Sequence, residues 1–201
     1  MANLVLASSS PRRQELLKQI GVSFEVFPSE VNENITIKDP IEYVRELSCM
    51  KALWVAERIS KGVILAADTI ILHRGKIMGK PLKKEDASDM LEVLSGDIHE
   101  VITGIALLDM NDMKKIVFDH GITKVYFKEL TKEVIDNYVA TGEPMDKAGS
   151  YAIQGYGALL VEKIQGDYSN VVGLPISKLL NHLLAFNISP GWMTHRAPDL
   201  S

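Results

Sequence analysis

The first residues that could do chemistry form a short polar run, Ser8-Ser9-Ser10-Pro11-Arg12-Arg13, directly after an apolar segment. Ser10 is a good N-cap and Pro11 suits the first helical position, so the run predicts a helix start. Arginines in a first turn oppose the helix dipole, at a cost of about 0.3–1 kcal/mol each. A bound anion would reverse that cost, since helix N–H groups, hydroxyls and guanidinium groups all bind phosphate. We therefore interpret Ser8, Arg12 and Arg13 as a phosphate site rather than an exposed basic turn with a serine cap.

Two lysines are further candidates for binding an anion. Lys51 falls within an apolar stripe of the helix predicted over residues 39–61, where the alternative is a packed stem whose ammonium group reaches water. Lys80 stands between Gly79 and Pro81, which fix the backbone around one cation. A lysine in an ordinary surface turn is the alternative there.

Asp68 interrupts the apolar segment that spans residues 63–72. Aspartate is a poor strand former and is costly to bury unpaired, so its carboxylate must meet a cation, a metal or several hydrogen-bond donors. A strand-borne carboxylate can serve as a metal ligand or as a general base. The structural alternative is a salt bridge to a core arginine.

A polar, glycine-punctuated segment covers residues 142–149 and is followed by Ile153-Gln154-Gly155. Such loops commonly carry function, although turn formation alone could explain the composition. The amide of Gln154 offers both a donor and an acceptor, which suits the imide edge of a nucleobase.

The remaining patterns predict the elements that must position these residues. Apolar segments predict strands over residues 4–7, 22–27, 63–72, 101–109, 116–128 and 158–164. Capping signals and helical periodicity predict helices over residues 11–20, 39–61, 84–94, 131–142 and 175–186. This order favours a mixed, twisted α/β sheet flanked by helices, with a cleft between two lobes. We expect one domain over residues 1–188 and an irregular tail over residues 189–201.

Composition limits the classes of function. The 201 residues carry a net charge of −4, without the basic excess that is typical of nucleic-acid binding. The single cysteine, Cys49, excludes an intrachain disulfide and is interpreted as a structural thiol in a reducing compartment. We find no signal peptide and no apolar segment of about 18 residues that would span a membrane, so we expect a cytoplasmic protein. The five histidines show no metal-ligand spacing.

The sequence resembles the Maf nucleotide pyrophosphatases over about residues 3–186. The opening signature lies in Leu6 to Leu17. Later motifs follow in order at Lys51-Ala52, Ala67-Asp68-Thr69, Gly79-Lys80-Pro81, Leu94-Ser95-Gly96, Val101-Ile102-Thr103-Gly104, Gly142 to Gly149, Ile153-Gln154-Gly155, Gly166-Asp167-Tyr168 and Val172-Gly173-Leu174-Pro175.

The resemblance implies a fold similar to the inosine triphosphate pyrophosphatases, a homodimer, and cleavage between the α and β phosphates of a nucleoside triphosphate with a divalent metal. In the family, the residue that matches Asp68 is the proton acceptor. The residues that match Arg12, Thr69 and Gln154 distinguish enzymes acting on dTTP and UTP from those acting on methylated GTP. This sequence has the dTTP and UTP pattern.

One departure concerns an Asp-Glu pair of the family, which reads Asn32-Glu33 here. We expect Glu33 and Asp68 to hold Mg²⁺ or Mn²⁺, and we expect Asp68 also to orient or deprotonate the attacking water. A larger set of side chains is expected to bind the triphosphate: Ser8, Arg13, Lys51 and Lys80. The alternative is a nucleotide-binding regulator of cell division without catalysis.

Overall fold

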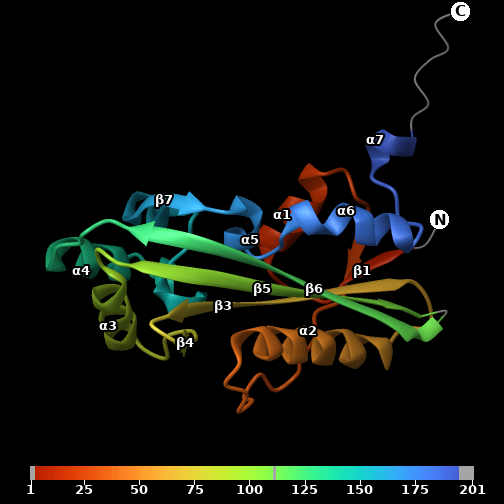
Figure 1. Cartoon of the computed structure of the whole chain (residues 1–201), viewed down its shortest axis with the longest axis horizontal. Coiled ribbons are helices and arrows are strands. Elements are labelled where there is room, and N and C mark those ends of the chain that lie inside the picture. Colours follow the sequence, from red (N-terminus) through yellow and green to blue (C-terminus); the bar gives the residue numbers. More distant parts are fainter. Residues whose placement is uncertain (1–2, 111, 195–201) are drawn as a thin grey trace, which may run out of the picture.

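The computed structural model describes residues 3–110 and 112–194. Within them the chain forms one seven-stranded sheet in the order β2-β1-β3-β5-β6-β7, with β4 also paired to β3 (Figure 1). The strands are β1 (Leu4–Leu6), β2 (Phe24–Val26), β3 (Val63–His73), β4 (Lys76–Met78), β5 (Ile98–Asp109), β6 (Asp112–Phe127) and β7 (Val161–Gln165). The α-helices are α1 (Pro11–Gln19), α2 (Pro40–Ala56), α3 (Lys84–Leu94), α4 (Lys132–Ala140), α5 (Tyr168–Val172), α6 (Ile176–Ala185) and α7 (Gly191–Thr194).

The sheet combines parallel and antiparallel pairs. β1 runs parallel to β2 and β3, whereas β3, β5, β6 and β7 pair antiparallel in succession. The mixed α/β architecture that the sequence predicts is therefore confirmed. Within the described part of the chain, no helix has the length and hydropathy needed to cross a membrane.

The two edges of β3 are paired differently. One edge pairs with β5 along residues 63–72, while the other pairs with β1 only from Val63 to Leu65 and with β4 only from Ile71 to His73. Among the described strands, none pairs with residues 66–70 on that second edge. The backbone of residues 66–70 therefore has no strand neighbour on that edge, which we call the open edge of β3, between the end of β1 and the start of β4.

One face of the sheet is covered by α2. Asp39 caps this helix by accepting from the N–H groups of Ile41 and Glu42 at 3.0 and 2.9 Å. Ala52 and Val55 of α2 are fully buried against even-numbered residues of β3 and β5, among them Ile64, Ala66, Ala106 and Leu108. The apolar stripe predicted for this helix is confirmed.

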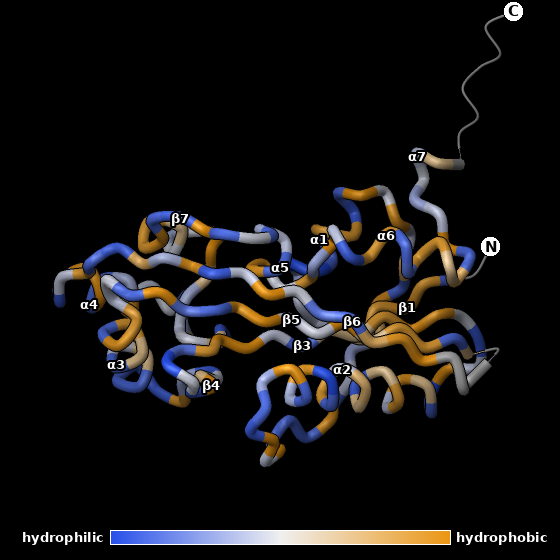
Figure 2. The backbone as a smooth tube through the Cα atoms, viewed as in Figure 1, coloured by the Kyte–Doolittle hydropathy of each residue, from blue (hydrophilic) through white to orange (hydrophobic). Residues whose placement is uncertain are grey.

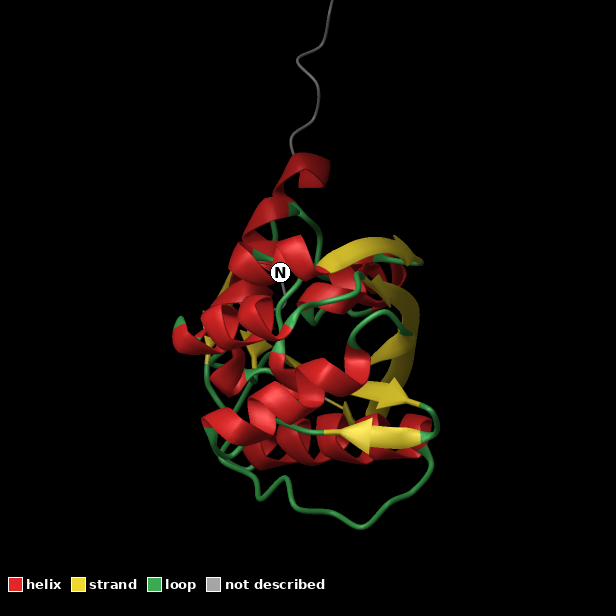
Figure 3. Ribbon diagram, turned by 90° about the vertical axis from the view of Figure 1, so that its left-hand side faces the viewer, coloured by secondary structure: helices red, strands yellow, loops and turns green. Residues whose placement is uncertain are grey.

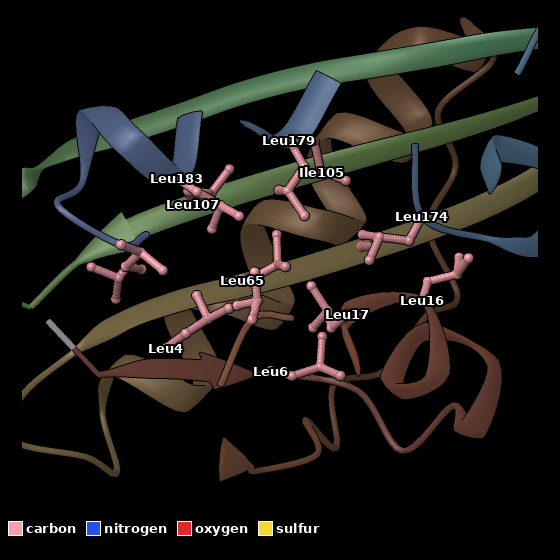
Figure 4. Close-up of a cluster of buried hydrophobic side chains, with 14 of the residues drawn as sticks. Leu4, Leu6, Leu16, Leu17, Leu65, Ile105, Leu107, Leu174, Leu179 and Leu183 are labelled. Carbon is pink, nitrogen blue, oxygen red and sulfur yellow. The ribbon is translucent and has the colours of Figure 1, made fainter. Parts of the chain in front are cut away.

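The opposite face carries two separate hydrophobic cores. The first packs α1 and α6 on the β1 end of the sheet, and Figure 4 shows Leu65 and Leu107 of the strands beside Leu179 and Leu183 of α6. Figure 2 shows hydrophobic colouring gathered around β1, where this core lies. The second core packs α3 and α4 on the far end of β3 and β5.

A polar seam separates these two cores. Thr69 of β3 lies opposite Thr103 of β5, between Ala67 of the first core and Ile71 of the second. Thr103 and the neighbouring Thr123 of β6 are fully buried. We call the group formed by Thr69, Thr103 and Thr123 the threonine seam.

Several element boundaries differ from the predictions. The helix predicted over residues 39–61 ends at Ala56, where the Arg58 guanidinium donates to the Trp54 carbonyl at 2.7 Å and the chain turns. The turn brings Gly62 (φ 108°) beside the Asn3 carbonyl, a conformation that favours glycine. The long loop before α2, residues 27–39, forms the lowest part of the molecule in Figure 3.

Other differences concern short elements. Residues 158–160 belong to a 3-10 turn (Gly155–Leu160) rather than to the predicted strand, which begins at Val161. The short elements β4, α5 and α7 lack the length needed for a periodic signal. Helix α7 falls in the tail predicted to be irregular, and residues 195–201 of that tail lie outside the described residues.

A buried histidine predicts how stability depends on pH. Burial lowers the pKa of His99 from 6.5 to about 4, the nearby His73 adds to this and Asp97 opposes it. Between pH 6.5 and pH 4 the His99 imidazole is therefore protonated in the unfolded chain but neutral in the folded chain. The free energy of unfolding should decrease by about 3 kcal/mol as the pH is lowered from 6.5 to 4. Urea unfolding of His99→Gln should show a weaker pH dependence, with His120→Gln as control. An unchanged dependence in His99→Gln would contradict this assignment.

Candidate active site

Arg13 is held by three hydrogen bonds at the end of β1. Its Nε donates to the Gly173 carbonyl at 2.7 Å, its Nη1 to Ser8 Oγ at 3.1 Å and its Nη2 to Thr69 Oγ1 at 3.1 Å. Arginine has five donors, so two N–H groups remain available to a ligand. Ser10 stands at the predicted N-cap of α1, although its hydroxyl makes no capping bond.

On the other side of β3, one ammonium group bridges two carboxylates. Lys51 Nζ lies 2.7 Å from Asp68 Oδ1 and 2.7 Å from Glu33 Oε1. Lys51 and Asp68 are only 7% and 6% exposed, so neither charge is solvated by bulk water. Asp68 meets a cation as the sequence predicts, and that cation is a lysine rather than the arginine of the structural alternative.

Glu33 is also influenced by a second lysine. Lys80 Nζ lies 3.9 Å from Glu33 Oε2 and is largely exposed. Partial burial alone would raise the pKa of Glu33, but the Lys51 ammonium, with Lys80 and Arg13 farther away, lowers it below its ordinary value. Glu33 is therefore ionised at neutral pH.

The pleat of β3 separates Asp68 from Thr69. Successive side chains of a strand point to opposite faces, so Asp68 faces α2 and Thr69 lies on the other face, where its hydroxyl meets that of Thr103. Both residues lie on the segment that lacks a strand partner on one edge, and Arg13 interacts electrostatically with Asp68 from the other face. The two halves of the cluster therefore meet at the same edge of β3.

Arg12 lies among acidic groups from a distant part of the chain. Burial lowers its pKa, and Asp146 and Glu143 partly offset that effect. An arginine so placed stays charged at neutral pH. The chain thus brings the start of α1 close to the segment after α4.

Glu143 organises the loop that carries Gln154. Its carboxylate accepts from the N–H groups of Tyr156 and Gly157 at 3.1 and 2.9 Å, and from the Tyr138 hydroxyl at 2.9 Å. Burial would raise the pKa of Glu143, but these donors outweigh it and lower the pKa. Gln154 is half-buried, and no described residue forms a hydrogen bond with its side-chain amide.

Several polar residues of this region carry no distinctive signal in the sequence. Thr103, Thr123 and Asn170 are fully buried behind Thr69. Threonine is a good strand former, so Thr103 shows no anomaly of the kind that marked Asp68. Glu143 belongs to a segment that was identified, but its contacts depend on tertiary structure.

An apolar cavity of about 650 Å³ lies elsewhere, between α1 and α6. Ile20, Leu180 and Trp192 are among its lining residues, and none of the predicted site residues contacts it. The polar cluster at β3 is therefore the better candidate for chemistry.

The carboxylate oxygens close to β3 are suitable ligands for a hard divalent cation. Asp68 and Glu33 supply carboxylate oxygens that converge on one point, now met by Lys51. No group of three potential ligands occurs within residues 3–110 and 112–194, so phosphate oxygens and water would complete an octahedron. Carboxylates and cations gathered in this way are the kind of groups that can bind a polyphosphate together with a metal ion.

The chain belongs to the Maf-like protein family, whose profile matches residues 3–186. It is 53% identical over 181 residues to the dTTP/UTP pyrophosphatase of Alkaliphilus metalliredigens (strain QYMF), covering 89% of this chain and 93% of that protein. It is 50% identical over 189 residues to the dTTP/UTP pyrophosphatase of Bacillus anthracis, covering 94% and 97%. The structure of a HAM1 protein from Coxiella burnetii matches 63% of this chain and 73% of its own, with a TM-score of 0.47 at 17% identity.

Replacing Lys51 tests how much its ion pair with Asp68 stabilises the folded protein. Lys51→Met leaves the buried carboxylate of Asp68 without its cation, and we expect the free energy of unfolding to decrease by about 3 kcal/mol at pH 7. Lys61→Met, at an exposed position, is the charge-matched control and should change stability little. Equal stabilities of the two variants in urea unfolding would show that the ion pair contributes nothing.

Proposed function

We propose that this chain hydrolyses dTTP and UTP to the nucleoside monophosphate and pyrophosphate. The observation that carries the proposal is the convergence of Asp68 and Glu33 on Lys51, beside Arg13 and across β3 from Thr69. The dTTP/UTP pyrophosphatases of three bacteria support it, at 50–53% identity over most of each chain.

The cations in the site would bind the triphosphate. Arg13 keeps two N–H donors after its three internal bonds, and its fixed planar group suits two phosphate oxygens. Ser8 would add a hydroxyl group. Lys51 and Lys80 would neutralise charge from the face of the sheet that α2 covers.

Asp68 and Glu33 would hold the metal, which is Mg²⁺ or Mn²⁺ in this proposal. When bound, such an ion neutralises phosphate charge and orients the water that attacks phosphorus. Asp68 is oriented by Lys51 at 2.7 Å, so one carboxylate oxygen is fixed and the other can accept the proton of that water. Arg12, Thr69 and Gln154 would contact the base.

The alternative function is nucleotide binding in the regulation of cell division, without turnover. Two carboxylates beside the phosphate site favour the enzyme, because a protein that only binds a polyanion loses affinity from each nearby negative charge. Burying the carboxylate of Asp68 also costs desolvation free energy, and buried carboxylates of this kind are common at catalytic sites.

A homodimer and a cytoplasmic location remain predictions.

Replacing Asp68 tests the enzyme directly. Asp68→Asn preserves the hydrogen bond from Lys51 but cannot accept a proton from water, so kcat for UTP should decrease about a thousandfold while the protein stays folded. Pyrophosphate release with dTTP, UTP and methylated GTP, at varied Mg²⁺ and Mn²⁺, measures this. Asp89→Asn on the exposed side of α3 is the control and should retain wild-type rates. A wild-type protein that cleaves none of these nucleotides would contradict the proposed function.

Replacing Gln154 tests recognition of the base. Gln154→Ala removes one donor and one acceptor, so KM for UTP and dTTP should increase about tenfold and the preference over GTP should decrease. The Mg²⁺ concentration that gives half-maximal rate should stay the same, because Asp68 and Glu33 are unchanged. Substrate ratios equal to those of the wild type would remove Gln154 from base recognition.

A further inference from the structure

Thr69 lies at the end of a chain of hydrogen bonds that continues into the protein interior. Arg13 Nη2 lies 3.1 Å from Thr69 Oγ1, which lies 2.9 Å from Thr103 Oγ1. Thr103 Oγ1 in turn lies 2.9 Å from the main-chain carbonyl oxygen of Asn170. Thr103 is fully buried, whereas Thr69 is half-buried at the open edge of β3.

The chemistry of the end groups fixes the direction of every bond in this chain. The Asn170 carbonyl oxygen can only accept, so the single proton of the Thr103 hydroxyl goes to it. Thr103 must then accept from Thr69, which uses the single proton of the Thr69 hydroxyl. Arg13 can only donate, so it occupies one lone pair of Thr69 Oγ1.

Thr69 therefore has one hydrogen-bonding capacity left, and it is an acceptor. A ligand group that contacts this hydroxyl must donate. A ligand atom that presents a lone pair to Thr69 Oγ1 would face the remaining lone pair of that oxygen. The ligand atom would also lose its hydrogen bond with water, which is costly in a desolvated site.

Gln154 has no comparable restriction. No described residue holds its side-chain amide in one orientation, so rotation can present either the carbonyl or the NH₂ group to a ligand. A freely rotating amide can donate from its NH₂ group to the 4-oxo group of uracil, or accept with its carbonyl oxygen from the 4-amino group of cytosine. Discrimination between these bases needs a group of fixed polarity.

We propose that Thr103 is a positioning residue that makes Thr69 an obligate acceptor, and that Thr69 thereby selects bases with an N3–H donor, uracil and thymine, over cytosine. The inference rests on the proposed function, since it assumes that the base reaches Thr69. Uracil and thymine carry a proton on N3, whereas N3 of cytosine carries a lone pair.

The surroundings of Thr69 support this placement. Gly173 (φ 121°) brings its backbone close to the hydroxyl, since a Cβ there would lie 3.5 Å from Thr69 Oγ1. Ile153, next to Gln154, packs against the hydrophobic core that contains Ala67 and Leu174. Thr69 and the loop of Gln154 therefore adjoin the same core on the same face of the sheet.

Thr103→Val tests the proposal, because valine has nearly the shape of threonine but no hydroxyl. The Asn170 carbonyl still accepts from the N–H of Gly173 at 3.1 Å, so the change leaves no buried acceptor unpaired there. The proton of Thr69 is released and can be donated to N3 of cytosine. We expect kcat/KM for CTP to increase and the UTP-to-CTP ratio of kcat/KM to decrease about tenfold.

Two further variants separate positioning from structural damage. Thr103→Ser keeps the hydroxyl and should keep the wild-type ratio. The double variant Thr69→Val with Thr103→Val has no hydroxyl to donate, so the gain in CTP turnover should disappear. A merely structural role of Thr103 cannot produce a gain with CTP, since damage to the fold lowers activity with both nucleotides.

The wild-type protein provides a test that does not depend on how well the variants fold. UTP methylated at N3 lacks the donor and should be cleaved at least tenfold less efficiently than UTP. Equal cleavage of the two compounds, or a Thr103→Val protein that loses activity with UTP and CTP by the same factor, would overturn the inference while leaving the pyrophosphatase function intact. Absence of cleavage of every nucleotide by the wild type would instead contradict the proposed function.

Discussion

Asp68 stands in the middle of an apolar strand with only 6% of its surface exposed, and an unpaired carboxylate in such a place is strongly unfavourable. The compensating charge comes from Lys51, on a helix that must lie against this face of the sheet for its ammonium to reach Asp68 at 2.7 Å. The same ammonium holds Glu33, which belongs to the long loop before α2. One buried charge thus fixes the relative positions of a strand, a helix and a loop, and it assembles both candidate metal ligands at the same point.

The incomplete pairing of β3 gives this buried charge access to a ligand. Had β1 continued along β3, residues 66–70 would be covered on both edges and the arginines at the start of α1 would lie elsewhere. Because β1 stops at Leu6, Ser8 and Arg13 come to the open edge, and β4 closes it again beyond Ile71. Asp68 then faces one side of the sheet and Thr69 the other. The Asp68–Lys51 ion pair and the Arg13–Thr69 hydrogen bond thus lie on opposite faces of a single strand.

The threonine seam has the complementary role on the second face. Two apolar cores flank it, so most polar groups between them pair with one another, although buried Asn170 Oδ1 has no hydrogen-bond partner among the described residues. Thr103 donates to the Asn170 carbonyl, and Asn170 Nδ2 donates to Thr123 Oγ1 at 3.0 Å and to the Val101 carbonyl at 2.9 Å. This network stabilises α5 against the sheet and fixes Gly173, whose carbonyl oxygen accepts from Arg13. Arg13 is therefore oriented in part by Gly173, which lies 160 positions away in the sequence.

Much of the architecture could be read from local signals. The sequence by itself determined that β3 is a buried strand, that α3 spans about Lys84–Leu94, and that Asp68 needs a cation, a metal or several hydrogen-bond donors. Periodicity, caps and the cost of burying charge act over a few residues, so local sequence is enough for these predictions. Tertiary structure alone decided that the cation is Lys51, that Glu143 holds the loop of Gln154, and that the hydroxyl of Thr69 is already donated to Thr103. Those facts depend on which distant groups the folded chain brings within about 3 Å of one another, and hydrogen bonds act only at that range.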